Sequence, residues 1–345
     1  MHNHHLRHER AFRRQRLAAW ICVICALLII IGAIIYSFQA GILPGFAGTR
    51  GSGPVLPGFS QPTSDSPCAA SHASGNSTIY LNSAGLKRNF IIHLPPSYGQ
   101  QPLPVVFNYH GYDNTAVRMA SYTNMGAEAD KANFIVVFPQ GANDGIGKPS
   151  WNAGIGAAGP TGNADDVQFT RDMIRYLQQH YCVDARRIYV TGYSIGASMA
   201  YRVACTLSKQ IAALATVEGA FYHFSGGCQP SRPLPVLVIH SLVDPLAPYN
   251  GDANRRLAAV STFLNVWFTI NKCNTNTRQT IFQKADVTGF KWPNCAAGTV
   301  VEHYRITDGG HVWPGSAIPM PTLGYTTHTI DANVVIWNFF AQFKS

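Results

Sequence analysis

Charged side chains are scarce in this 345-residue chain. Asp, Glu, Lys and Arg make up 12% of the sequence, while 46% of the residues are hydrophobic. An ordinary globular protein has about 25% charged residues. This balance excludes a chain that is disordered throughout, and it predicts one sizeable folded domain with flanking segments.

Blocks of basic residues are missing from most of the chain. The formal net charge is +9, but residues 1–16 contain five arginines and one glutamate and so carry +4 of it. The remaining positive charge is spread without clusters of Lys or Arg, which is typical of a solvated surface. The sequence therefore predicts no nucleic-acid partner.

The longest apolar run lies near the N-terminus. Residues 17–38 form a stretch of 22 residues in which Ser37 is the only clearly polar side chain. At about 1.5 Å per residue, such a helix crosses the roughly 30 Å core of a bilayer. Five arginines precede the run and only Arg50 follows it closely, which predicts a cytoplasmic N-terminus. We expect an uncleaved signal anchor, with secretion after cleavage as the alternative.

These features divide the chain into four parts. Residues 1–16 are expected to form a basic cytoplasmic tail, 17–38 a transmembrane segment and 39–67 a linker. Between residues 41 and 67, 15 of 27 residues are Gly, Pro or Ser, a composition that gives a spacer without a core. Residues 68–345 then form an extracytoplasmic domain, which the membrane segment tethers.

Cysteines outside the apolar run are even in number. No CxxC or Cys/His spacing among them matches a zinc site, so we expect neither a metal nor a cofactor. An even set on the oxidising side of a membrane predicts three disulfides. Proximity favours Cys273 with Cys295, and the other four allow three pairings. The six residues are Cys68, Cys182, Cys205, Cys228, Cys273 and Cys295.

Apolar, β-rich segments alternate with helix-compatible segments after residue 100. Such alternation, with continuous apolar strands, predicts an α/β fold with a mostly parallel sheet and helices on both faces. We also expect Asp165 and Asp166 to cap a helix. The expected strands are 104–109, 134–138, 188–191, 213–217, 236–239 and 300–306, and the expected helices are 166–181, 195–208, 255–270 and 331–343.

Residues 187–200 have the sequence of a strand that enters a Gly-x-Ser-x-Gly turn and continues as a helix of small residues. Gly192 and Gly196 allow the backbone to crowd around Ser194, so that the serine hydroxyl stands off the end of the sheet. This pattern predicts a nucleophile elbow. A purely structural Gly-Ser turn is the alternative.

A serine nucleophile needs a base that takes its proton and an acid that orients the base. With an elbow of this kind the acid follows the serine and the histidine comes last. Asp244, in a loop just after an expected strand, is the predicted acid, and Asp308 is its rival. His311, in a glycine-flanked loop after the last strand, is the predicted base.

The negative charge that develops on an ester oxygen needs two backbone N–H donors. Ile195 directly follows the nucleophile and is expected to supply one donor. Tyr112 is expected to supply the other, in preference to Gly111. Trp151 and Trp313 are candidates for stacking on a sugar or phenolic ring of the substrate, with core packing as an equal alternative.

From about residue 68 to the end, the chain resembles the secreted feruloyl esterases and polyhydroxybutyrate depolymerase-like esterases of the α/β-hydrolase superfamily. The resemblance implies the α/β-hydrolase fold and a serine carboxylesterase with the triad Ser194, Asp244 and His311. It also supports the pairing of Cys273 with Cys295. The segments that carry it are residues 88–98, 139–141, 151–154, 165–169, 181–189, 213–222 and 309–315, together with the Asp244 loop.

Three function hypotheses follow. The first is an extracytoplasmic serine carboxylesterase that hydrolyses feruloyl, acetyl or polyhydroxyalkanoate-type esters on polymers through an acyl-enzyme. An acyltransferase or a serine peptidase on the same fold is the second. The third is a membrane-tethered carbohydrate-binding protein without catalysis. Ile195 and Ala197 stand where the family often has Asn and Gly, which affects the acyl pocket rather than the triad.

Overall fold

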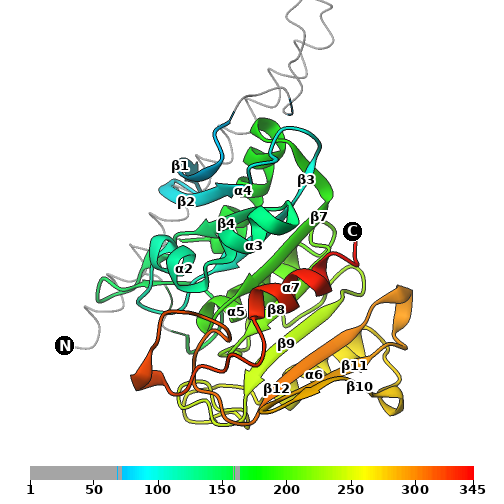
Figure 1. Cartoon of the computed structure of the whole chain (residues 1–345). Coiled ribbons are helices and arrows are strands. Elements are labelled where there is room, and N and C mark those ends of the chain that lie inside the picture. The colour runs from blue at the N-terminus through cyan, green and yellow to red at the C-terminus, as the bar shows by residue number, and fades with distance from the viewer. Residues whose placement is uncertain (1–67, 69–71, 158, 160–163) are drawn as a thin grey trace, which may run out of the picture. The chain divides into compact units, whose positions relative to one another are not determined.

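A ten-stranded sheet forms the centre of the computed structural model, which describes Cys68, residues 72–157, Gly159 and residues 164–345 (Figure 1). The strands are β1 (Gly75–Ser83), β2 (Leu86–Leu94), β3 (Leu103–Tyr109), β4 (Ile135–Pro139), β7 (Val183–Gly192), β8 (Ala213–Val217), β9 (Val236–Ser241), β10 (Gln279–Lys284), β11 (Val287–Trp292) and β12 (Val301–Ile306).

The strand order is β1-β2-β4-β3-β7-β8-β9-β12-β11-β10. The strands from β4 to β12 in this order run parallel to one another. Antiparallel strands flank them at both edges. The described residues therefore have the mostly parallel sheet that the sequence predicts.

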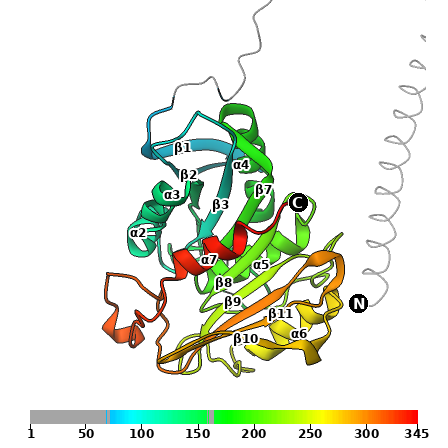
Figure 2. The same ribbon diagram turned by 45° about the vertical axis from the view of Figure 1, so that its right-hand side comes forward.

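Helices cover both faces of this sheet (Figures 1 and 2). One face packs on α4 (Asp166–His180), α5 (Ile195–Thr206) and α6 (Val260–Ile270). The other packs on α2 (Ala116–Thr123), α3 (Met125–Ala132) and α7 (Ala332–Phe340). The short elements are β5 (Ala142–Asn143), β6 (Pro149–Ser150), η1 (Thr275–Thr277), η2 (Ala296–Gly298) and η3 (Pro321–Leu323).

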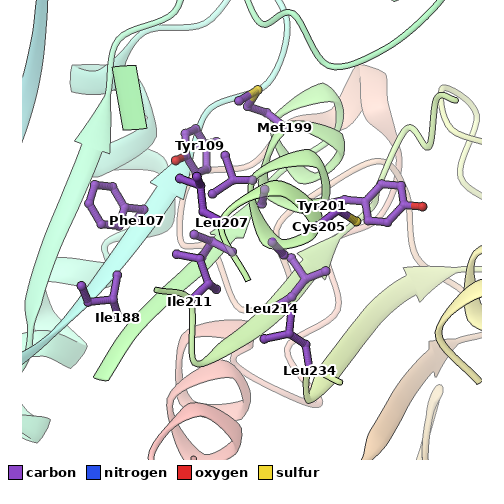
Figure 3. Packing of buried hydrophobic residues seen from close by; sticks show 14 of the residues in the cluster. Phe107, Tyr109, Ile188, Met199, Tyr201, Cys205, Leu207, Ile211, Leu214 and Leu234 are labelled. Atoms are coloured by element: carbon purple, nitrogen blue, oxygen red, sulfur yellow. The ribbon is translucent and has the colours of Figure 1, made fainter. Parts of the chain in front are cut away.

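The central strands are apolar without alternation because both of their faces are buried. In β3, Val105 and Phe107 belong to the core under α5, whereas Val106 belongs to the core under α2. Every residue of β3, β4, β8 and β9 is buried. Figure 3 shows Met199 of α5 and Leu207 of its C-terminal turn in the same core as Phe107 and Tyr109 of β3.

All of the expected strands and helices are present, with shifted ends. The largest shifts are of five residues: β7 begins at Val183 rather than at residue 188, and α6 begins at Val260 rather than at residue 255. Asp252 and Leu257 exchange backbone hydrogen bonds of 2.9 and 2.8 Å, which hold the preceding residues in a tight turn. The sequence missed the outer strands β1, β2, β10 and β11 and the eight-residue helices α2 and α3. Strands β1 and β10, at the two edges, are largely exposed, and both helices are short.

Three disulfides join the six cysteines outside the apolar run: Cys68 with Cys182, Cys205 with Cys228, and Cys273 with Cys295. The predictions of three disulfides and of the Cys273–Cys295 pair are thus confirmed. The predicted tail, membrane segment and linker, residues 1–16, 17–38 and 39–67, lie outside the described residues. Within the part of the chain that is described, none of the helices combines the length and apolarity needed to cross a bilayer.

The two aspartates before α4 have different roles. Asp165 caps the helix, because its side chain accepts a hydrogen bond of 2.9 Å from the Gln168 amide. Asp166, also predicted as a cap, is instead a buried ion-pair partner. Its Oδ1 lies 2.8 Å from Nη2 of Arg88, and its Oδ2 accepts from the Asn152 amide at 2.7 Å.

The Arg88–Asp166 pair gives a stability prediction. We expect Arg88→Met to lower the free energy of unfolding by about 3–5 kcal/mol, because it leaves the Asp166 carboxylate buried without its cation. Urea denaturation measures this loss. Arg175→Met is the matched control, since Arg175 in α4 lies 3.5 Å from Asp172 at the surface, and it should cost less than about 1 kcal/mol. Equal losses in both variants would contradict the assignment.

Candidate active site

The carboxyl ends of the central strands meet at one edge of the sheet. Tyr109 at the end of β3 lies opposite Gly192 of β7, and Val217 at the end of β8 lies opposite Ile239 of β9. The loops that leave this edge carry the predicted site residues. In open α/β sheets, ligands bind outside this edge.

Ser194 stands on a sharp turn between β7 and α5. Its backbone has φ 59° and ψ −124°, a left-handed conformation that is uncommon for a residue other than glycine. Both flanking glycines are needed for space. A Cβ on Gly196 would lie 2.2 Å from the Tyr109 carbonyl oxygen, and a Cβ on Gly192 would lie 2.3 Å from the Gly196 carbonyl oxygen. The segment therefore has the geometry of a nucleophile elbow.

His311 and Asp244 are joined directly. Nδ1 of His311 donates a hydrogen bond of 2.6 Å to Oδ2 of Asp244. The other oxygen of Asp244 accepts from the amides of Leu246 and Ala247, each at 2.7 Å. Burial raises the pKa of the Asp244 carboxyl. The hydrogen bonds that the carboxylate accepts, of which that from His311 has the largest effect, outweigh burial and leave the pKa below its usual value. The carboxylate is thus ionised at neutral pH.

The His311 loop is held against the elbow. The backbone amide of His311 donates to the Leu323 carbonyl at 2.7 Å, and the Tyr193 hydroxyl donates to the His311 carbonyl. The rings of Tyr193 and His311 lie 4.9 Å apart. Because Tyr193 directly precedes Ser194, these contacts hold the His311 loop next to the Ser194 turn. The rival acid, Asp308, is exposed to solvent.

Ser194 and His311 line one cavity of about 480 Å³. Gly111, Tyr112 and residues of α2 also line it. The wall is largely apolar, which suits an acyl or aryl group beside the serine. Its apolar side chains are Val117, Leu246, Ile318, Met320 and Leu323.

The two predicted amide donors, Ile195 and Tyr112, come from segments next to the serine. Ile195 is the first residue of α5, so its N–H has no carbonyl partner within the helix. Gly111 approaches so closely that a Cβ on it would lie 3.5 Å from Cβ of Ser194. Tyr112, which follows, lines the cavity, and its hydroxyl donates to Asp144 at 2.8 Å.

The two candidate tryptophans lie in the core instead of the cavity wall. Both side chains are 0% exposed. The indole N–H of Trp151 donates to the His110 carbonyl at 2.7 Å, and that of Trp313 donates to Oδ1 of Asn333 at 3.2 Å. Fully buried rings present no face to a substrate, so this arrangement matches the packing alternative.

Sequence reasoning missed a buried acid beside the predicted triad. Glu218 directly follows β8, is 0% exposed and accepts hydrogen bonds of 3.1 and 3.0 Å from the Ser241 amide through its two oxygens. Polar atoms of Glu218, His240 and Asp244 all lie within 4.8 Å of one another. The signal for it was a lone acidic residue at the end of an otherwise apolar strand.

This buried cluster is unsuited to a metal ion. Nε2 of His240 donates its proton to the Ala247 carbonyl at 2.8 Å, so this nitrogen offers no lone pair. Burial lowers the pKa of His240 to about 4, which keeps the ring neutral at physiological pH. Both oxygens of Asp244 are already engaged by hydrogen-bond donors.

Comparisons with known proteins agree on one family and one fold. Residues 88–251 match the family described as Esterase PHB depolymerase. Feruloyl esterase B of Piromyces equi is 31% identical over 236 residues, which are 65% of this chain and 42% of that protein. The bifunctional acetylxylan esterase/xylanase XynS20E of Neocallimastix patriciarum is 24% identical over 69% of this chain and 33% of that protein. The matches thus span less than half of either relative.

A solved structure shares the fold. The acetyl xylan esterase from Aspergillus awamori aligns with a TM-score of 0.54 at 13% identity, covering 77% of this chain and 99% of that one. At an identity this low, the similarity supports a shared fold but not a shared function. The described domain therefore has the α/β-hydrolase fold that the sequence predicts.

Proposed function

We propose that this chain, whose residues 88–251 match the esterase PHB depolymerase family, is a serine carboxylesterase acting on polymer-linked esters. The observation that carries the proposal is the shared cavity of Ser194 and His311, with Asp244 bonded to His311 at 2.6 Å. A strained serine, a histidine and a buried carboxylate at one sheet edge are the parts that acyl transfer needs.

In the proposed mechanism, His311 takes the proton of Ser194 while the serine oxygen attacks the ester carbonyl. Asp244 holds His311 in the tautomer that leaves its other nitrogen free to accept this proton. The amides of Ile195 and Tyr112 bind the negative oxygen of the tetrahedral intermediate. His311 then protonates the leaving alcohol, and a water molecule, activated in the same way, releases the acid from Ser194.

The substrate class is proposed on two grounds. The matched relatives are named feruloyl esterase and acetylxylan esterase; the first name gives a phenolic acyl group, and the second gives an acetyl group on a polysaccharide. The apolar cavity wall fits a phenolic, acetyl or hydroxyalkanoate acyl group better than a charged one. The polymer itself would remain outside the cavity.

We further propose that the catalytic domain, residues 68–345, works outside the cytoplasm. Its three disulfides are typical of an oxidising compartment. The apolar run 17–38 supports a membrane anchor and residues 39–67 a linker. Protease treatment and fractionation of cells that express the full chain test this proposal. We expect external protease to digest the catalytic domain and to leave the N-terminus protected.

Activity-based labelling followed by an ester panel tests the proposed function. We expect a fluorophosphonate probe to add its mass to the peptide that contains Ser194, and we expect turnover of at least one of methyl ferulate, acetylated xylan and short polyhydroxybutyrate. Competing alcohols and a peptide substrate separate hydrolysis from acyl transfer and from proteolysis. Absence of labelling, or labelling with turnover of no ester, would contradict an esterase.

A further inference from the structure

Glu218 occupies a strained, fully buried position directly behind the predicted triad. Its backbone has φ 44°, a left-handed conformation that a glutamate rarely adopts. The residue is 0% exposed, and an oxygen of its carboxyl group lies within 4.8 Å of an oxygen of the Asp244 side chain. Strain of this kind persists where the surroundings fix it, and it concentrates at functional sites.

The surroundings fix Glu218 from two sides. The Ser241 amide donates to both carboxyl oxygens, at 3.1 and 3.0 Å. Nε2 of His240 lies 3.6 Å from Oε2 of Glu218 and 3.7 Å from Oδ2 of Asp244. The two carboxyl groups therefore share one buried space beside His240, with oxygens within 4.8 Å of each other.

Among the described groups that act on Glu218, none is a cation that could balance the two carboxyl groups. His240 is neutral, because burial lowers its pKa to about 4. Burial also raises the pKa of Tyr122 and of Tyr193, which lie near the pair, so neither tyrosine carries a charge at neutral pH. The titratable groups that face the pair are His240 beside it on β9, His311 from the loop after β12, Tyr193 from the elbow and Tyr122 from α2.

Two adjacent buried carboxylates without a cation repel each other, so one of the two holds a proton. Asp244 receives three strong donors, from His311, Leu246 and Ala247, each of which stabilises its ionised form. Glu218 receives only the shared Ser241 amide. Burial, followed by the charge of Asp244, raises the pKa of Glu218 well above its ordinary 4.5. The proton therefore resides on Glu218.

We propose that Glu218 is a positioning residue of the active site, which stays protonated and donates its O–H to Asp244, so that the Asp244 carboxylate is held toward His311. The inference rests on the proposed function, because it takes the roles of Asp244 and His311 from there. A neutral donor also avoids placing a second negative charge behind the base.

Substitution of Glu218 in the full-length chain tests this role. Glu218→Gln keeps a neutral donor of the same shape, so we expect kcat/KM for p-nitrophenyl acetate to stay within about threefold of the parent. Glu218→Ala frees Asp244, and we expect a loss of about 10- to 100-fold, as for other small displacements of catalytic groups. Glu302→Gln, at a second buried glutamate that pairs with Lys291 at 3.1 Å, is the matched control and should leave activity unchanged.

The pH profile distinguishes positioning from a merely structural role. Loss of the donor makes Asp244 a stronger base, so the acid limb of kcat/KM should move to higher pH in Glu218→Ala and stay in place in Glu218→Gln. A move to lower pH in Glu218→Gln would mean that the native residue is ionised and would overturn the proposal. Equal losses in the Gln and Ala variants, or full activity in the Ala variant, would overturn it as well.

Thermal stability gives a readout that needs no substrate. A carboxyl group with a raised pKa stabilises the fold fully below its ordinary pKa, and this contribution is lost as pH rises toward the folded-state pKa. Gln does not titrate, so the Tm of Glu218→Gln relative to the parent should rise by about 2 °C or more from pH 5 to pH 8. A constant difference would overturn the protonated state. Because this result is independent of turnover, it separates failure of the inference from failure of the proposed function.

Discussion

Replacing Ser194 with alanine is expected to lower kcat/KM for p-nitrophenyl acetate by about 10⁵- to 10⁶-fold and to abolish fluorophosphonate labelling. The substitution removes the oxygen that forms the acyl-enzyme, so the remaining rate comes only from binding and from the oxyanion donors. Alanine fits the turn at φ 59° as well as serine does, so the fold should remain intact. Mass spectrometry of the labelled peptide and steady-state kinetics measure both effects.

Ser198→Ala is the matched control for this prediction. Ser198 lies in the same helix, α5, is 0% exposed, and its hydroxyl accepts a hydrogen bond of 3.1 Å from the Tyr222 amide. It has no access to an ester, so this variant should keep both labelling and turnover. More than about 1% residual activity in Ser194→Ala would mean that another group is the nucleophile.

Replacing Asp244 with asparagine is expected to lower kcat by about 10⁴-fold. In other triad enzymes the amide keeps the shape of the acid but stabilises the wrong histidine tautomer and leaves the imidazolium without its counter-charge. Here the acceptor bond is short, 2.6 Å from Nδ1 of His311 to Oδ2 of Asp244, and both groups are buried. Steady-state kinetics with purified full-length protein measure the loss.

The same kinetics decide between the two acids that the sequence offers. Asp308→Asn changes the exposed aspartate three residues before His311, and it should leave kcat within about twofold of the parent. A large loss in Asp308→Asn, with Asp244→Asn active, would reverse the assignment. Since the pKa of Asp244 lies below its usual value, Asp244 should keep its charge to a lower pH than an ordinary aspartate does.

The elbow and the central strands could be predicted because local constraints decide them. A Cβ on Gly192 would lie 2.3 Å from a backbone oxygen four residues later, and a Cβ on Gly196 would lie 2.2 Å from a backbone oxygen of the adjacent strand. Only glycine therefore fits at these two positions. Strands β3, β4, β8 and β9 are buried on both faces, so their sequences are continuously apolar and easily recognised. The half-exposed edge strands lack that signal.

Other assignments depended on distant partners. Asp166 has the sequence position of a helix cap, but Arg88, 78 residues earlier, makes it an ion-pair partner. Trp151 and Trp313 have the chemistry of substrate platforms, yet neighbouring elements cover both rings. Glu218 has no motif at all, and its proximity to Asp244 arises only because β8 and β9 are neighbours in the sheet.

By itself, the sequence determined the fold class, the glycine-flanked turn at Ser194 and the even set of cysteines, and it predicted the order of acid and base, because each depends on residue type and short-range spacing. Tertiary structure alone decided which carboxyl groups share a buried space, which cysteines pair among Cys68, Cys182, Cys205 and Cys228, and which side chains line the cavity. Those features depend on strand order and burial, which bring together residues far apart in the chain and set the charge that each of them can carry.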